Sequence, residues 1–93
     1  MVGMTRAHIA EPHIARKIME GREDEIRPCV GATYCLDRIY TGGEALCIHN
    51  PATGREAGMP HEIAPGDGPA RKVVVVGAGP AGLEAARVAS ARG

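Results

Sequence analysis

The segment from Lys72 to Gly93 constrains this chain most, because its residue types follow the order strand, glycine turn, helix. Val73 to Val76 is a β-branched run without polar alternation, which is typical of a buried strand in a parallel sheet. Six residues rich in glycine follow directly, and helix-forming residues continue from there. We therefore predict a strand over Lys72 to Val76 and a helix from about Pro80 to Ala91.

The turn between these two elements has the spacing of a phosphate-binding loop, GxGxxG. In that geometry Gly77 permits the tight turn, Gly79 lets the backbone approach a pyrophosphate, and Gly82 lets the helix pack closely. The unpaired N–H groups and the helix dipole favour an anion at the helix start. The alternative is an ordinary glycine-rich turn. The predicted nucleotide-binding residues are Gly77, Ala78, Gly79, Pro80, Ala81 and Gly82.

The complete motif contains a second strand, which ends about 20 residues further on in an acidic residue that binds ribose. This sequence stops at Gly93, before such a strand. We therefore expect it to be part of a longer protein.

The sequence contains three cysteines within a short span, Cys29, Cys35 and Cys47. Iron–sulfur clusters need closely spaced thiolates in a loop and another from further along the chain. A fourth thiol would complete the pattern at Ala32, but alanine cannot ligate a metal. Several alternatives stay open: a three-iron cluster, a cubane with a non-cysteine ligand, no cluster, zinc with His49 or His61 as a fourth ligand, and free thiols.

The N-terminal part predicts a helix from about Pro12 to Glu20, stopped by Gly21. Met1 to Met4 has the character of a strand end that runs into a loop. A further short helix is predicted near Leu36 to Tyr40. The helical spacing places Ile14, Ile18 and Met19 on the packed face and Arg16, Lys17 and Glu20 on the solvated face.

Composition excludes several classes of function. The formal net charge is zero, so there is no basic field to attract nucleic acid. The apolar runs are too short to span a bilayer, and no signal peptide precedes them, so a cytoplasmic location is expected. With two tyrosines as the only aromatic residues, a large independent core is not predicted. Prolines and glycines between residues 58 and 70 indicate a linker.

With these motifs taken together, the whole chain resembles the middle of NADH:flavin oxidoreductases of the trimethylamine dehydrogenase and 2,4-dienoyl-CoA reductase type. Gly3 to Ala7 and Ile9 to Pro12 resemble the end of that family's flavin-binding barrel, although Glu11 replaces the usual aspartate. The three cysteines match three of the family's four cluster ligands, and Cys47 to Pro51 matches the segment around the last one.

The resemblance implies an α/β fold in four parts. Residues 1–27 would be the last strand and helix of a TIM barrel, and residues 28–57 the iron–sulfur loop region. Residues 58–70 would be the linker, and residues 71–93 the first strand, turn and helix of a Rossmann-like domain that binds FAD or NAD(P).

The resemblance also implies cofactors and partners. Thr5 and Arg6 would bind the FMN phosphate, the cysteines a 4Fe-4S or 3Fe-4S cluster, and the glycine turn FAD or ADP, with NAD(P)H as a further cofactor. The remaining polypeptide would be the partner, and a homo-oligomeric parent is compatible with this interpretation. The parent would pass electrons between these groups and act on enoyl thioesters or N-methylated amines, while the segment alone would be inactive. The alternative is a small independent metal-binding module.

Overall fold

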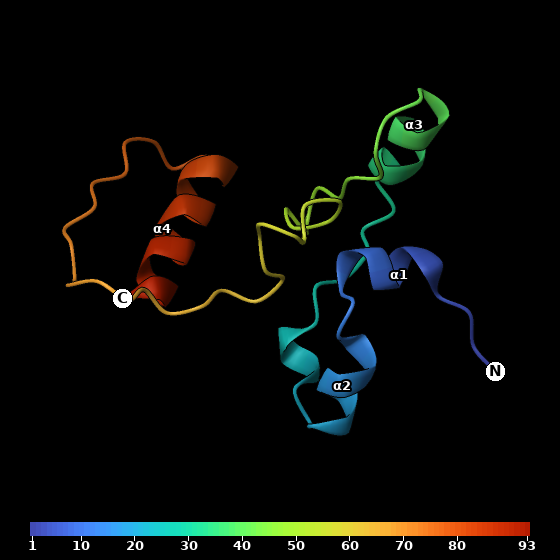
Figure 1. Cartoon of the computed structure of the whole chain (residues 1–93), viewed down its shortest axis with the longest axis horizontal. Coiled ribbons are helices and arrows are strands. Elements are labelled where there is room, and N and C mark those ends of the chain that lie inside the picture. The colour runs from blue at the N-terminus through green and yellow to red at the C-terminus, as the bar shows by residue number, and fades with distance from the viewer. The chain divides into compact units, whose positions relative to one another are not determined.

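The computed structural model describes residues 1–93 and consists of helices joined by irregular segments (Figure 1). It divides into two compact units, residues 1–61 and residues 62–93, and the division falls within the predicted linker. The first unit contains helices α1, α2 and α3 and the 3-10 helix η1, and the second contains α4. Their bounds are Thr5–Ala10 (α1), Ile14–Met19 (α2), Glu23–Glu25 (η1), Tyr34–Tyr40 (α3) and Pro80–Arg92 (α4).

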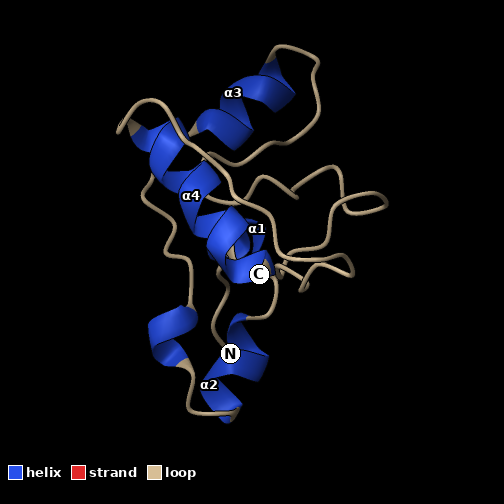
Figure 2. Cartoon of the chain, turned by 90° about the vertical axis from the view of Figure 1, so that its left-hand side faces the viewer, coloured by secondary structure: helices blue, strands red, loops and turns tan.

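The predicted α/β architecture is wrong, because the structure contains no strand (Figure 2). Residues 72–76 are irregular, and Val76 is 96% exposed. A strand requires hydrogen bonds to a neighbouring strand, and the only regular element that shares this unit is a helix. Residues 1–4 are irregular for the same reason. Neither the barrel end nor the first strand of a Rossmann-like domain is therefore formed.

The predicted N-terminal helix is split into two shorter ones. The residue before a proline avoids the helical region, and Glu11, which precedes Pro12, is extended with φ −137° and ψ 91°. Helix α1 thus ends at Ala10, which the sequence analysis did not anticipate, and α2 begins only at Ile14.

Helix α2 ends as predicted around Gly21, which adopts a positive φ of 68°. The backbone N–H of Gly21 donates to Ile18 O (3.2 Å), and that of Arg22 donates to Lys17 O (2.8 Å). These two bonds form a Schellman motif, which satisfies carbonyls that the last turn leaves open. The chain then reverses, and α2 packs against η1.

The predictions for α3 and α4 are confirmed. Helix α3 covers the predicted Leu36 to Tyr40 and stops at two glycines, where Gly43 N–H donates to Arg38 O (2.7 Å). Helix α4 begins with Pro80 at its first helical position and runs to Arg92.

The interior of the first unit is mainly polar. Ala10 and Ala52 are its only buried apolar residues, whereas Ile18 is 50% and Met19 87% exposed. The predicted packed face of α2 is therefore wrong. Lys17, predicted to be solvated, is 5% exposed. Three further polar side chains are buried with it, Glu11, Asn50 and Thr53, and Arg27 is half-buried.

Lys17 is buried because it finds partners for its charge. Its Nζ lies 2.6 Å from Glu11 Oε2 and donates to the backbone oxygen of Glu25 at 2.8 Å. The Glu11 carboxylate also accepts the backbone N–H groups of His13 (3.2 Å) and Arg27 (3.5 Å). A buried charge is tolerated when it is paired and hydrogen-bonded in this way.

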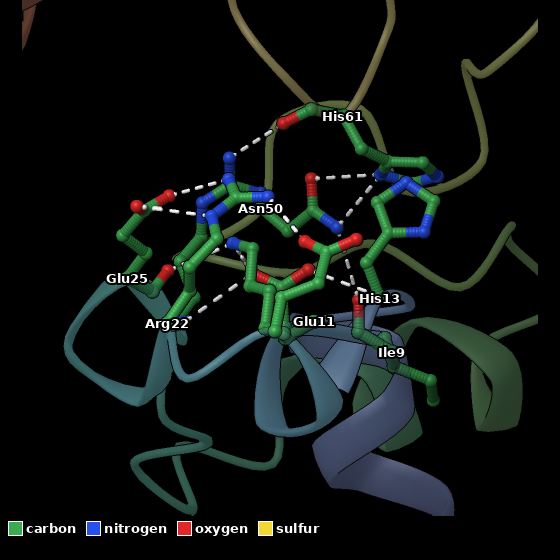
Figure 3. Close-up of polar contacts among 10 residues, drawn as sticks. Ile9, Glu11, His13, Arg22, Glu25, Asn50 and His61 are labelled. Atoms are coloured by element: carbon green, nitrogen blue, oxygen red, sulfur yellow. Dashed lines mark hydrogen bonds and ion pairs between the residues drawn. The ribbon is translucent and has the colours of Figure 1, made fainter. Parts of the chain in front are cut away.

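A second set of hydrogen bonds joins the helical segment to residues 50–61 (Figure 3). Asn50 Nδ2 (3.2 Å) and Thr53 Oγ1 (3.0 Å) both donate to the carbonyl of Ile9. Asn50 Nδ2 also lies 3.0 Å from His61 Nδ1, and the Arg27 guanidinium donates to His61 O at 2.6 Å. Side-chain hydrogen bonds thus replace the apolar contacts that usually hold distant segments together.

Candidate functional site

The three cysteines line one small cavity of about 30 Å³ in the first unit. Cys29 is exposed, Cys35 and Cys47 are half-buried, and all three are free thiols. Cys35 belongs to the first turn of α3, so the predicted loop already becomes helical at its last residues. Ala32, the position without a ligating side chain, lines the same cavity.

The loop between Cys29 and Cys35 has an unusual backbone. Gly31 has φ +71°, which glycine adopts without strain, but Thr33 has φ +56°. A positive φ is unfavourable for a β-branched residue. Thr33 is the N-cap of α3, and its hydroxyl donates to Ala32 O instead of capping the helix. The surrounding loop therefore holds an unfavourable conformation, which is more common at functional sites than elsewhere.

The predicted thiols share a cavity but do not form a metal centre in this structure. No group of three or more Cys, His, Asp or Glu side chains is arranged to hold a metal ion. A cavity of about 30 Å³ has room for only one or two water molecules. The loop would have to open, or its thiols turn inward, before a larger group could be held.

His49 also lines this cavity, and its ring is fixed by the backbone next to Cys29. Its Nδ1 lies 3.0 Å from the carbonyl oxygen of Pro28. From the sequence, His49 is predicted only as one of two alternative fourth ligands of zinc, the other being His61. The sequence does contain an indication that His49 lies near the cysteines, because Cys47-Ile48-His49 places an imidazole two residues from a thiol.

Thr5 and Arg6, predicted to bind a flavin phosphate, lie in the first turn of α1. Arg6 is exposed and lines the cysteine cavity. The structure thus brings this cation and the three thiols to one cavity, although α2 and η1 lie between Arg6 and Cys29 along the chain.

In the second unit, the glycine turn has the local geometry that a phosphate-binding loop needs. Gly77 has φ +112°, which only glycine adopts readily. A Cβ at Gly82 would overlap Gly77 O, and it would lie 3.3 Å from Val75 Cγ1. At Gly79 a Cβ would meet nothing within 4 Å. Glycine is therefore required at position 77 by its backbone conformation and at position 82 by close packing, whereas the space at Gly79 is open.

Helix α4 begins at this open position. Gly79 is its N-cap, and no side chain caps the N-terminal N–H groups. The turn residues are exposed, apart from the half-buried Gly82. A larger open cavity of about 710 Å³ lies elsewhere in this unit, between residues 66–75 and the later turns of α4, and no residue of the glycine turn lines it.

Among the buried groups, Glu11 has a pKa that departs from its ordinary value. Burial raises the pKa of its carboxyl, but hydrogen bonds from Lys17 and from the backbone of His13 and Arg27 outweigh burial. The net result is a pKa below the ordinary value of 4.5, so the carboxylate is ionised at neutral pH. This network supports the fold.

Comparison with known proteins shows close relatives over the whole chain. The chain is 73% identical to the probable N-methylproline demethylase of Rhizobium meliloti and 66% identical to the N,N-dimethylglycine/sarcosine dehydrogenase of Chromohalobacter salexigens. It is 56% identical to the multifunctional alkene reductase/demethylase OYE of Caballeronia cordobensis. All 93 residues are covered in each case. The chain corresponds to a segment of the NADH:flavin oxidoreductase family.

This segment spans about 14% of the length of the first two relatives and 13% of the third. No family model matches the chain, and no solved structure matches it. No helix is long and apolar enough to cross a membrane.

The residues around the cysteine cavity suit an iron–sulfur cluster by their chemistry. Thiolates are the usual ligands of such clusters, and three of them line the cavity with one imidazole. Their chemistry fits the group, although the distances of a bound metal are not formed.

Proposed function

We propose that this chain is the segment of a flavin-dependent oxidoreductase that links its cofactors. The observation that carries the proposal is the alignment of all 93 residues with enzymes named for demethylation and dehydrogenation of N-methylated amines. In this proposal residues 1–27 contact FMN, residues 28–57 hold the cluster, residues 58–70 are a linker, and residues 71–93 begin the binding site of a second nucleotide.

Cys29, Cys35 and Cys47 are the proposed thiolate ligands of the cluster. Their common cavity supports this assignment, since it brings a thiol from α3 together with thiols from two loops. When bound, the cluster supplies one-electron transfer between flavin cofactors. Both the three-iron and the four-iron forms are compatible with three thiolates.

The turn Gly77 to Gly82 is the proposed binding site for the diphosphate of FAD or ADP. The open space at Gly79 allows a ligand oxygen to approach the backbone, and the uncapped N-terminus of α4 offers N–H donors. Gly77 and Gly82 hold the turn against the helix. The positive end of the α4 dipole adds to the attraction of an anion.

Thr5 and Arg6 are the proposed contacts to the FMN phosphate. Arg6 is exposed, so its guanidinium is accessible to a ligand. A guanidinium binds phosphate through paired, charge-assisted hydrogen bonds. Its place at the cysteine cavity would bring the FMN phosphate close to the cluster ligands.

For the substrate of the full-length enzyme we propose an N-methylated amine. The two relatives of highest identity named above are an N-methylproline demethylase and a dimethylglycine/sarcosine dehydrogenase. Reduction of an activated alkene is the second candidate, since the relative at 56% identity is an alkene reductase as well as a demethylase. Steady-state assays of the full-length enzyme with N,N-dimethylglycine and with cinnamate separate the two.

Anaerobic reconstitution of the full-length protein with iron and sulfide tests the cluster assignment. The wild type should become brown with charge-transfer absorbance, and Cys35→Ser or Cys47→Ser should lose most of it. Val30→Ala is the matched control, because Val30 lines the same cavity without a ligating atom. A colourless product that contains zinc would contradict the proposal and favour a structural zinc module.

A further inference from the structure

We propose that His49 is the fourth protein ligand of the centre held by the three cysteines. This inference rests on the proposed cluster and assigns the position that Ala32 leaves open. A cubane needs a ligand on each of its four irons, and the thiols supply three. His49 lines the same cavity as the three thiols and Ala32.

The hydrogen bond of His49 prepares it for this role. A carbonyl oxygen can only accept, so the contact of 3.0 Å with Pro28 O requires the proton to be on Nδ1. The neutral ring then has its free electron pair on Nε2. Metal-ligating histidines commonly use this arrangement, in which one nitrogen binds a backbone carbonyl and the other binds the metal.

The same hydrogen bond joins two parts of the proposed centre. Pro28 directly precedes Cys29, and His49 is two residues from Cys47. The bond therefore connects the segments that carry the first and third thiols, 21 residues apart from Pro28 to His49. A ligand anchored in this way loses little freedom when it binds.

Other side chains are less suited to the open position. His61 lies outside the cavity, where Nδ1 contacts Asn50 and Nε2 lies 3.7 Å from Glu56. Tyr34 lines the cavity, but a phenol becomes a good metal ligand only after it has lost its proton. A neutral imidazole binds without such a step at neutral pH.

A histidine in place of a thiolate changes the properties of the centre. Imidazole is neutral, so the cluster has one negative charge fewer than with four cysteines. Iron–sulfur centres in which histidine replaces cysteine have higher reduction potentials. We therefore expect Ala32→Cys, which offers a fourth thiolate from the same cavity, to lower the potential of the cluster.

Pulsed EPR of the reduced full-length protein, prepared with isotope-labelled histidine, tests the assignment. The wild type should show nitrogen coupling from one histidine. His49→Ala should lose this coupling and retain fewer irons per sulfide, while His8→Ala, which changes an exposed histidine in α1, should keep both. The double variant Ala32→Cys/His49→Ala should regain the iron content without the nitrogen coupling.

The outcomes separate this inference from the proposed function. A cluster without histidine coupling, or one that His49→Ala leaves unchanged, would overturn the assignment of His49 and leave the three cysteine ligands in place. Wild-type protein without iron and sulfide would overturn the proposed cluster and this inference with it.

Discussion

Replacing Gly82 with alanine is the sharpest test of the glycine turn. The added Cβ would overlap Gly77 O and lie 3.0 Å from the Gly77 carbonyl carbon and 3.3 Å from Val75 Cγ1. Favourable contacts between carbon atoms lie at about 3.5–4.0 Å, so the turn must move away from α4. Two of the three contacts are with backbone, which cannot rotate aside as a side chain can.

The expected cost follows from this overlap. Forcing an extra methyl group into a closely packed site typically costs about 1–3 kcal/mol. If the whole cost is expressed as lost nucleotide affinity, Kd rises by about 5-fold to 150-fold. The displacement also moves the N–H donors of Gly79 and Ala81 away from the phosphate, so a value near the upper end is expected.

Calorimetric titration of the full-length protein, stripped of nucleotide, with FAD and with ADP measures this change. Gly79→Ala is the informative partner, because its Cβ meets nothing within 4 Å and its φ of −74° suits alanine. That variant should melt like the wild type yet bind nucleotide more weakly, since the methyl group occupies the approach to the backbone. Gly68→Ala, also open, is the control. Unchanged affinity in Gly82→Ala would refute the reasoning.

Three further predictions concern the first unit. Lys17→Met should destabilise it by about 3–5 kcal/mol, because the buried Glu11 carboxylate would lose its cationic partner; urea unfolding should show this, and Glu11→Gln in the same chain should recover most of the loss. Because the pKa of Glu11 is lower in the folded state, its contribution is complete above pH 4.5 and is lost as the pH falls through that lowered value; an NMR titration of the Glu11 carboxyl that gives a midpoint at or above 4.5 would contradict this. Asn50→Ala should cost about 1–3 kcal/mol, because it leaves the buried Ala52 N–H without its acceptor and removes one of the two side-chain donors to the Ile9 carbonyl; thermal melting with Thr53→Ser as the conservative control checks it.

Sequence reasoning succeeded where a structure depends on nearby residues. Helices α3 and α4 lie where they were predicted, because glycines after Tyr40 and a proline at position 80 act within one turn of the chain. The break before α2 also depends on a nearby residue, Pro12. The sequence pattern did not predict that the preceding residues, Thr5–Ala10, form a helix of their own.

Prediction from the sequence failed where a structure depends on partners that are distant in the sequence. A β-branched run such as Val73 to Val76 becomes a strand only beside another strand, and this chain provides none. Helical spacing placed Lys17 in solvent, but its partner Glu11 lies across the Pro12 turn, where spacing along a single helix gives no information. The shared cavity of the cysteines and His49 likewise follows from tertiary contacts that a motif cannot reveal.

The central claim is that separate parts of this segment serve separate cofactors of one enzyme. Quantifying flavin, adenine nucleotide, iron and sulfide in anaerobically purified full-length protein tests it most directly, when wild type is compared with Cys47→Ser and Gly79→Val. The account predicts that the wild type contains all of these groups, that Cys47→Ser loses iron and sulfide but keeps the nucleotides, and that Gly79→Val loses the adenine nucleotide but keeps iron. Wild-type protein that contains neither the cluster nor the adenine nucleotide would contradict this claim. Variants with the same cofactor content as the wild type would contradict it as well.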